Sequence, residues 1–158
     1  MSFRSALRAD DAVAVRALVE ATGFFRTDEA DIAVELVEET LTRGAGAGYQ
    51  FLFADGPDGK LDGYTCFGRV PATATGFDLY WIAVSPDAQR RGLGGRLLAA
   101  SAEICRGQGG RRLYADTSGR PQYAPTRAFY LRQGFEIAAV FPDFYADGDD
   151  KVVFSKPL

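Results

Sequence analysis

Histidine is absent from this sequence of 158 residues, and there are only two cysteines. Without histidine, Ser-His-Asp and Cys-His catalysis are excluded, as is any zinc site that uses an imidazole ligand. Proton transfer must therefore rely on carboxylates, tyrosines, water or the substrate. The two cysteines, Cys66 and Cys105, lie far apart without CxxC spacing. This usage is typical of reduced core thiols in a cytosolic protein, and no metal site is expected.

Long apolar runs are missing as well. The first residues, Met1-Ser2-Phe3-Arg4, carry no apolar region of a signal peptide, and no stretch reaches membrane-spanning length. A formal net charge of -3 argues against a nucleic-acid partner, because phosphate binding needs a basic face. We expect a cytoplasmic protein with no membrane or nucleic-acid partner, and a single domain over residues 1–158.

The spacing of apolar residues predicts helices first and strands later. Residues 3–8 are expected to form a short strand. Two helices follow, the first capped at Asp10 or Asp11 and the second at Thr27 or Asp28. The apolar positions at helical spacing are Val15, Leu18 and Val19 in the first helix, and Ile32, Leu36, Val37 and Leu41 in the second.

After glycines at 44, 46 and 48 the period changes to that of strands. A strand, a helix and a strand in succession imply a right-handed crossover and a parallel pair. The expected fold is an α/β or α+β domain with a mixed sheet. The expected strands are 49–54, 61–70, 77–84 and 113–117, followed by a closing hairpin of 135–141 and 151–155. One further helix is expected from just after residue 95 to about residue 106, and another from 125 to 134.

The strand at 77–84 has two largely apolar faces, as expected of a central strand covered by helices. One face carries Phe77, Leu79, Trp81 and Ala83, and the other carries Asp78, Tyr80, Ile82 and Val84.

A glycine-rich loop joins this strand to the next helix. Gly92 and Gly94 let the backbone turn tightly and approach a ligand, and the amides at the positive end of the helix suit a phosphate or pyrophosphate. Arg90 and Arg91 would add charge at the rim. The loop fits neither a Walker motif nor a dinucleotide fingerprint, since it continues as Gly94-Gly95-Arg96-Leu97. The alternative is a glycine-rich connection without a ligand.

Two motifs resemble those of the GNAT superfamily of acyl-CoA-dependent N-acyltransferases. Gln89-Arg90-Arg91-Gly92-Leu93-Gly94 is similar to its acyl-CoA-binding motif, and Tyr130-Leu131-Arg132-Gln133-Gly134-Phe135 is similar to its Tyr-x-x-x-Gly-Phe block. The order of elements is similar over nearly the whole chain. The resemblance implies a single mixed, mostly antiparallel sheet with a central splayed parallel strand pair and helices on both faces.

The resemblance also implies roles. The loop amides would hold the coenzyme A pyrophosphate, and the backbone of the central strand would pair with the pantetheine arm of acetyl-CoA, the cosubstrate. Tyr130 would act as general acid to the thiolate; the alternative is a tyrosine packed on a helix face. Tyr123 stands where the family often has an asparagine, and Ser118, Thr126 or a backbone group are the candidates to replace it. The implied cofactor-binding residues are Ile82, Ala83, Val84, Gln89, Arg90, Arg91, Gly92, Leu93, Gly94 and Gly95.

A direct attack of a neutral amine on the thioester needs no covalent intermediate. The backbone N–H near Val84 is the candidate donor to the developing oxyanion. Asp78 is the first candidate for the general base, because the family often has an acidic residue in this region that acts through water, and Asp116 is its competitor. The alternative for each carboxylate is a solvated or capping role.

The acceptor pocket is less well defined by the sequence. Tyr80, Asp116, Thr117 and Tyr145 are candidate wall residues, and Tyr64 and Cys66 are expected in the core. The acidic segment 143–150 is expected to be the loop of the last hairpin, able to attract a cationic amine. A solvated loop is the alternative, and is favoured for Asp147, Asp149 and Asp150.

The leading hypothesis is an acetyl-CoA-dependent N-acetyltransferase that acts on a small-molecule or peptide amine, with a homodimer as a candidate assembly. The second is a non-catalytic acyl-CoA-binding sensor or regulatory module. The third is a nucleotide- or phosphate-binding domain unrelated to coenzyme A.

Overall fold

The computed structural model describes residues 2–158, and its six strands form one sheet in the order β1-β2-β3-β4-β6-β5. β3 and β4 pair in parallel, whereas β1–β2, β4–β6 and β5–β6 are antiparallel, so the predicted mixed, mostly antiparallel sheet with a parallel pair is confirmed. The strands are β1 (Gln50–Asp55), β2 (Leu61–Arg69), β3 (Gly76–Val84), β4 (Arg112–Ser118), β5 (Glu136–Ala146) and β6 (Asp149–Pro157). The helices are α1 (Asp11–Ala21), α2 (Thr27–Arg43), α3 (Pro86–Gln89), α4 (Leu93–Gly107) and α5 (Ala124–Arg132), with 3-10 turns η1 (Gly44–Ala47) and η2 (Pro121–Tyr123).

The chain divides into two compact units. The first contains residues 2–68 and 79–101, and the second contains residues 69–78 and 102–158. β3 contributes to both, because its first residues pair with β4 and the rest belongs to the first unit.

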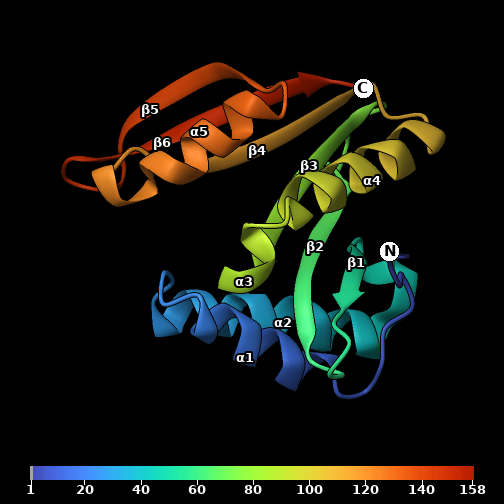
Figure 1. The fold of residues 1–158 in the computed structure, drawn as a ribbon. Helices are drawn as coiled ribbons and strands as arrows, with labels where there is room; N and C mark the ends of the chain where they lie inside the picture. Colours follow the sequence, from blue (N-terminus) through green and yellow to red (C-terminus); the bar gives the residue numbers. More distant parts are fainter. Residues whose placement is uncertain (1) are drawn as a thin grey trace. The chain divides into compact units, whose positions relative to one another are not determined.

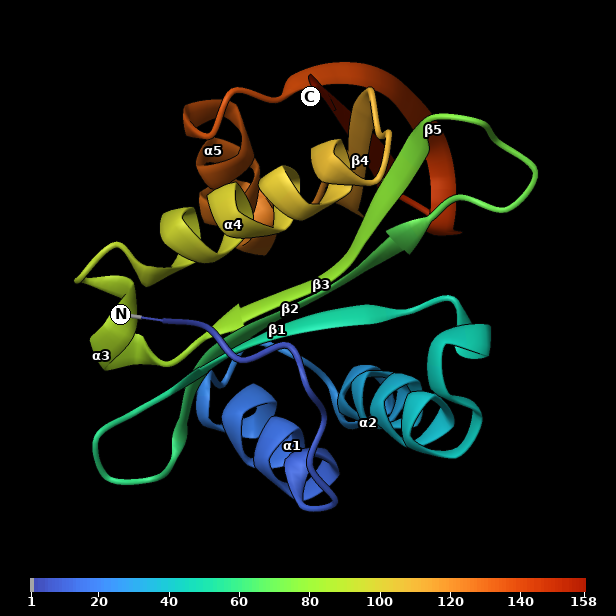
Figure 2. The ribbon, with the colours of Figure 1, turned by 90° about the vertical axis from the view of Figure 1, so that its right-hand side faces the viewer.

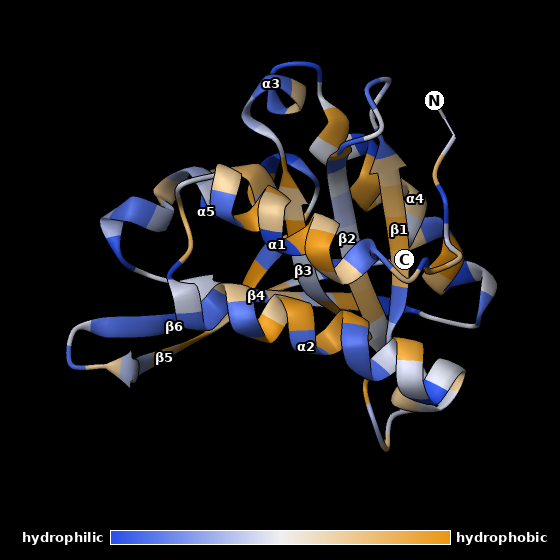
Figure 3. Cartoon of the chain, turned by 90° about the horizontal axis from the view of Figure 1, so that it is seen from below, coloured by the Kyte–Doolittle hydropathy of each residue, from blue (hydrophilic) through white to orange (hydrophobic). Residues whose placement is uncertain are grey.

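In the first unit, α1 and α2 pack against each other on one side of β1 and β2 (Figure 2). Apolar and polar segments alternate along both helices, as expected of helices that bury one face (Figure 3). The predicted face of α1 is confirmed. That of α2 is partly wrong, because Ile32 and Leu41 are exposed. The core holds Val15, Leu18, Val19, Ala30, Ala33, Val37, Phe51, Phe53, Leu61, Tyr64, Cys66 and Ala83.

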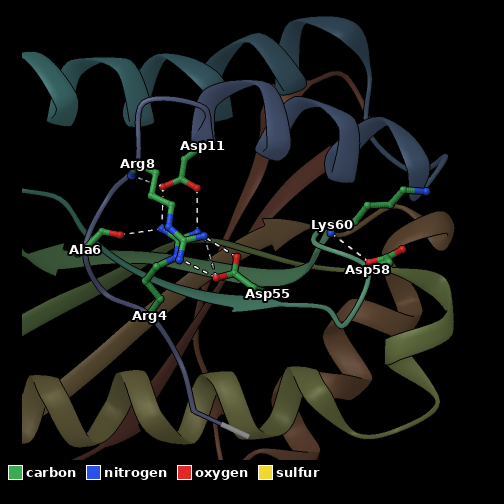
Figure 4. A network of polar contacts seen from close by, with 7 residues as sticks. All are labelled: Arg4, Ala6, Arg8, Asp11, Asp55, Asp58 and Lys60. Atoms are coloured by element: carbon green, nitrogen blue, oxygen red, sulfur yellow. Dashed lines mark hydrogen bonds and ion pairs between the residues drawn. The ribbon is translucent and has the colours of Figure 1, made fainter.

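The N-terminal segment does not form the predicted strand. Arg4 alone bridges to Phe53, with backbone N···O distances of 2.9 and 2.8 Å. The segment is fastened instead by the Arg4 guanidinium, which donates to both oxygens of Asp11 and both oxygens of Asp55 (Figure 4). Asp11 also accepts the N–H of Arg8, so its carboxylate joins segments and does not cap α1.

The start of α2 also differs from the prediction. The helix begins at Thr27, and the preceding residue, Arg26, is its N-cap. The Glu29 carboxylate accepts the N–H of Arg26 at 3.1 Å, which satisfies an amide that the helix leaves free. Thr27 and Asp28 therefore lie inside the first turn.

In the second unit, α5 lies along the sheet of β4, β6 and β5 (Figure 1). The last hairpin is longer than predicted, because β5 continues to Ala146 and β6 begins at Asp149. The segment 143–150 is therefore mostly strand, and only residues 147 and 148 turn, with Gly148 at φ 76°. A break in register between Phe141 and Ala146 bends β5.

Candidate active site

The predicted site residues fall into two groups, one in each unit. The first unit holds the glycine-rich loop and most of β3, with Tyr80, Ile82, Ala83 and Val84. The second unit holds Tyr130, Asp78, Asp116, Thr117 and Tyr145.

A short helix that the sequence analysis missed leads from β3 into the loop. Ser85 caps α3 by accepting the N–H of Ala88 at 3.3 Å, and Pro86 occupies its first turn. The sequence signal was present, since serine followed by proline and an acid is a helix start. Gln89, predicted to bind the cofactor, donates its side-chain amide to the Val84 carbonyl at 3.0 Å. Its side chain therefore ties the loop to the end of β3.

The loop turns into α4 through Gly92, whose φ of 71° lies in the left-handed region that favours glycine. The amides of Arg91 and Gly92 donate within the turn, to Ala88 and Gln89. The amide of Arg96 reaches the Gly92 carbonyl at 3.3 Å. Helix geometry leaves the amides of residues 93–95 without an intrahelical partner, at the positive end of the helix dipole. These three amides suit a phosphate group.

The charges beside the loop are exposed. Arg90 and Arg91 are both solvent-accessible, and Arg91 pairs with Asp62 at 3.3 Å. Arg90 forms no ion pair within residues 2–158, so its guanidinium is available to a ligand.

Within β3, Tyr80 and Ile82 are half-buried, whereas Ala83 and Val84 are buried. The Tyr80 ring meets the Tyr49 ring edge to face at 5.2 Å between centroids. This packing holds Tyr80 against the start of β1.

In the second unit the two faces of β4 differ sharply. Leu113, Ala115 and Thr117 are buried, whereas Arg112 and Asp116 are exposed. Successive strand residues point to opposite faces, so Asp116 and Thr117, both predicted as pocket walls, cannot line the same side.

Tyr130 lies on the buried side. Its ring contacts those of Phe129, Phe135 and Phe154, with centroids 5.7, 5.3 and 5.3 Å away, and only 5% of the residue is exposed. Burial, and then the charge of Asp116, raise the pKa of the Tyr130 phenol above its ordinary value of 10.0. The hydroxyl therefore stays protonated at neutral pH and can donate a hydrogen bond.

The open side carries a charged cluster. Tyr145 Oη donates to Asp116 Oδ2 at 3.3 Å, and Lys151 Nζ lies 4.0 Å from the same oxygen. Lys151 Nζ also lies 4.5 Å from the centroid of the Phe144 ring. Burial and the Asp116 charge raise the pKa of Asp78, and Lys151 opposes this shift. A carboxylate with a raised pKa is a stronger base than an exposed one.

The acidic turn of the hairpin is not uniformly solvated, contrary to the interpretation for Asp149. Its side chain is buried, accepts the Ser118 hydroxyl, and pairs with Arg120 at 3.2 Å. Ser118 also accepts the N–H of Arg120. Its hydroxyl is thus engaged inside the protein, where it fixes the segment before α5. The buried Tyr123 ends η2, directly before α5.

The two cysteines are free and buried, as predicted. Burial raises the pKa of the Cys105 thiol to about 12 and also raises the pKa of Cys66. Burial thus disfavours the thiolate at both positions, as is usual for structural cysteines. Over residues 2–158, no three acidic, cysteine or histidine side chains gather as metal ligands. In the same part of the chain, every helix is too short or too polar to span a bilayer.

Comparisons with known proteins agree with this geometry. Residues 15–135 match the sequence model of the acetyltransferase (GNAT) family. Among solved structures, a GNAT-family protein from Desulfovibrio desulfuricans is 50% identical, with a TM-score of 0.96 over 99% of this chain and 98% of the other. No curated protein sequence matches the chain.

Two more distant structures share the fold. An aminoglycoside 6'-N-acetyltransferase in complex with coenzyme A is 18% identical, with a TM-score of 0.78 over 99% of this chain and 97% of the other. A ribosomal-protein-alanine N-acetyltransferase from Brucella melitensis is 22% identical, with a TM-score of 0.78 over 100% of both chains.

Proposed function

Because the chain belongs to the acetyltransferase (GNAT) family, we propose that it transfers an acetyl group from acetyl-CoA to a primary amine of a small molecule or peptide. The observation that carries the proposal is the left-handed turn at Gly92 into the N-terminus of α4. It presents three successive amides to one anion, as a pyrophosphate requires. The family match runs through both units, which supports one acyl-CoA N-acyltransferase domain over residues 1–158.

The reaction needs a group that donates a proton to the leaving sulfur and a group that accepts the proton of the amine. The amine nitrogen bonds to the acetyl carbon, the carbon–sulfur bond breaks, and the thiolate takes a proton from Tyr130. Asp78, or a water that it holds, takes the proton from nitrogen. Tyr130 lies on the buried side of the β4–β6 sheet, whereas Asp78 lines the hollow beside Asp116. The acid and the base would thus approach the thioester from opposite sides.

The distant structures support this class of acceptor. An enzyme that acts on aminoglycosides and one that acts on the alanine of a ribosomal protein share the fold. Both acceptors are amines. We expect the protein to work in the cytoplasm, and homodimer formation stays a prediction for sedimentation analysis.

The first test is calorimetric titration with acetyl-CoA, with ATP and NAD as controls. Saturable micromolar binding of acetyl-CoA alone is expected. Binding of ATP or NAD with no binding of acetyl-CoA would favour the nucleotide-binding alternative. Binding of acetyl-CoA without transfer to any amine in a broad panel would favour the sensor alternative.

A pair of glycine variants localises the binding. Gly92 and Gly59 both have positive φ, 71° and 79°, and a side chain at either would meet no atom within 4 Å. Alanine at either position therefore introduces similar backbone strain without a clash. Gly92→Ala should weaken acetyl-CoA binding about tenfold, since it displaces the amides that bind the anion. Gly59→Ala, in the β1–β2 turn, should not.

A further inference from the structure

The exposed face of β4 is unusual for an interior strand. β4 lies between β3 and β6 in the sheet, yet Arg112 and Asp116 are exposed and Tyr114 is only half-buried. Interior strands of a covered sheet normally carry apolar residues on both faces. The charged residues show that this face of β4 is left uncovered and is accessible to water or to a polar ligand.

This face is hollowed. Residues of the second unit line an open hollow of about 610 Å³, which is within the range of small-molecule sites. Both carboxylates of the cluster described above line it, together with three cations. The lining is polar along β4 and apolar at Val70 and Val153.

One end of the hollow has an excess of negative charge. Asp78 and Asp116 face it, and Lys151 is the cation beside them. Asp78 is half-buried and forms no ion pair among the described residues. An ammonium group placed here would relieve the repulsion between the two carboxylates.

The other end has an excess of positive charge. Arg111 and Arg112 line it, and neither pairs with a carboxylate in the described part of the chain. Within residues 2–158, the one hydrogen bond of the Arg112 side chain goes to the Ser155 hydroxyl, at 2.8 Å. The register sets Asp78 beside Tyr114 and Gly76 beside Arg112. Along the strands, Arg112 thus lies about 7 Å from the level of Asp78 and about 13 Å from that of Asp116, at roughly 3.3 Å per residue.

From this arrangement we propose that the acceptor is an amino acid, an amine that also carries a carboxylate. This inference rests on the proposed function and names its substrate class. The ammonium group lies at Asp78 and Asp116, and the carboxylate is held by Arg112 and Arg111, for which a guanidinium fork is well suited. The products are an N-acetyl amino acid and the free thiol of coenzyme A. A polycation would bring further positive charges against Arg111, Arg112 and Lys151.

The test compares L-amino acids with their carboxamides, which keep the amine and lose the carboxylate. Spermidine and kanamycin serve as polycationic amines. We expect kcat/KM for the best amino acid to exceed that for its carboxamide about tenfold or more. Equal or higher values for the carboxamide, for a peptide amine or for a polycation would overturn the proposal.

Variants assign the preference to the hollow. Arg112→Met and Arg111→Met should raise KM for the amino acid far more than they change kcat/KM for the carboxamide. Arg112→Lys, which keeps the charge, should retain part of the preference. Arg106→Met is the matched control, since Arg106 is exposed in α4 and, among the described residues, pairs only with Glu103. A preference that survives in both Arg→Met variants would also overturn the proposal.

The same assays separate this inference from the proposed function. Acetylation of carboxamides or polycations without a preference for amino acids would refute the acceptor class and leave the acetyltransferase intact. If no amine is acetylated although acetyl-CoA binds, the proposed function itself fails, and the inference fails with it.

Discussion

Burial sets the chemistry of individual side chains in this protein. Tyr130 and Tyr64 are both almost fully buried tyrosines with a raised pKa, yet their settings differ. Tyr130 lies near the Asp116 carboxylate. Tyr64 lies in the apolar core of the first unit, where its hydroxyl has no hydrogen-bond partner among residues 2–158. The phenol therefore has a proposed catalytic role at Tyr130, whereas at Tyr64 the buried hydroxyl costs stability.

The first prediction concerns Tyr130→Phe. This change should lower kcat about a hundredfold, because the thiolate loses its proton donor. Acetyl-CoA affinity should change less than about threefold, since the ring still packs on Phe135 and Phe154. Steady-state kinetics and calorimetry measure the two effects. Tyr49→Phe is the control, and equal turnover of Tyr130→Phe and the parent would reject the assignment.

The second prediction concerns the pH profile of Asp78. The base must be ionised, so kcat should fall as the pH drops through its raised pKa, which lies above the ordinary value of 3.8. Asp78→Asn should lower kcat about a hundredfold and remove this acidic limb. If the acidic limb of the pH profile persists in Asp78→Asn and disappears in Asp116→Asn, Asp116 is the base.

The third prediction concerns Tyr64→Phe. Removing a buried hydroxyl that has no partner should raise the free energy of unfolding by about 1 kcal/mol. The neighbouring Thr65 is the matched contrast, because its buried hydroxyl lies 2.7 Å from that of Ser101. Thr65→Val should therefore destabilise the protein by about 1 kcal/mol. Denaturant unfolding measures both, and a destabilised Tyr64→Phe would contradict the assignment.

At the scale of elements, salt bridges and hydrogen bonds connect the irregular segments to the helices and strands. Arg4 connects the N-terminal segment to α1 through Asp11 and to β1 through Asp55. The Asp149 carboxylate similarly ties β6 to the segment before α5. Such contacts depend on residues far apart in the sequence, and periodicity does not reveal them.

The fourth prediction follows from the Arg4 contacts. Arg4→Met should lower the free energy of unfolding by about 3 kcal/mol at neutral pH, because the Asp11 side chain is 3% exposed and loses its counter-ion. Arg8→Met is the control, since Arg8 is exposed and lies 3.4 Å from Asp55; its loss should cost less than about 1 kcal/mol. Similar losses in both variants would contradict the role of Arg4.

The effect should depend on pH. The hydrogen bond from Arg4 lowers the pKa of Asp55 below its ordinary value of 3.8. The stability that the ionised Asp55 gains from Arg4 is therefore present at pH values above 3.8, and it is lost as the pH falls through the lowered pKa. The difference between the parent and Arg4→Met should shrink in strong acid.

For the whole molecule, cosubstrate binding should appear as stability. A ligand that binds only the folded state at a hundred times its Kd adds about 2.7 kcal/mol. For a chain of this length the fifth prediction is a rise in Tm of about 5 to 10 °C with saturating acetyl-CoA. ATP at the same concentration should leave Tm unchanged. An equal shift with ATP would indicate binding of nucleotides in general.

The sequence by itself determined most of the elements. The change of hydrophobic period, the loop with Gly92 and the block around Tyr130 predicted the mixed sheet and the family, because these signals are local. Where they failed, non-local contacts decided. Residues 3–8 pair with β1 only at Arg4, whose side chain bonds Asp11 and Asp55. Ile32 is exposed because the small residues Ala30 and Ala33 bury the opposite side of α2.

Only the tertiary structure decided which charged residues share a face. Arg112, Asp116 and Lys151 come from two strands, and the sequence shows no motif that joins them to Asp78. The β3–β4 and β4–β6 registers bring all four to one hollow, and the bend in β5 adds Tyr145. A strand's own alternation fixes which residues share its face, whereas pairing between strands fixes their neighbours, and pairing depends on the packing of the whole sheet.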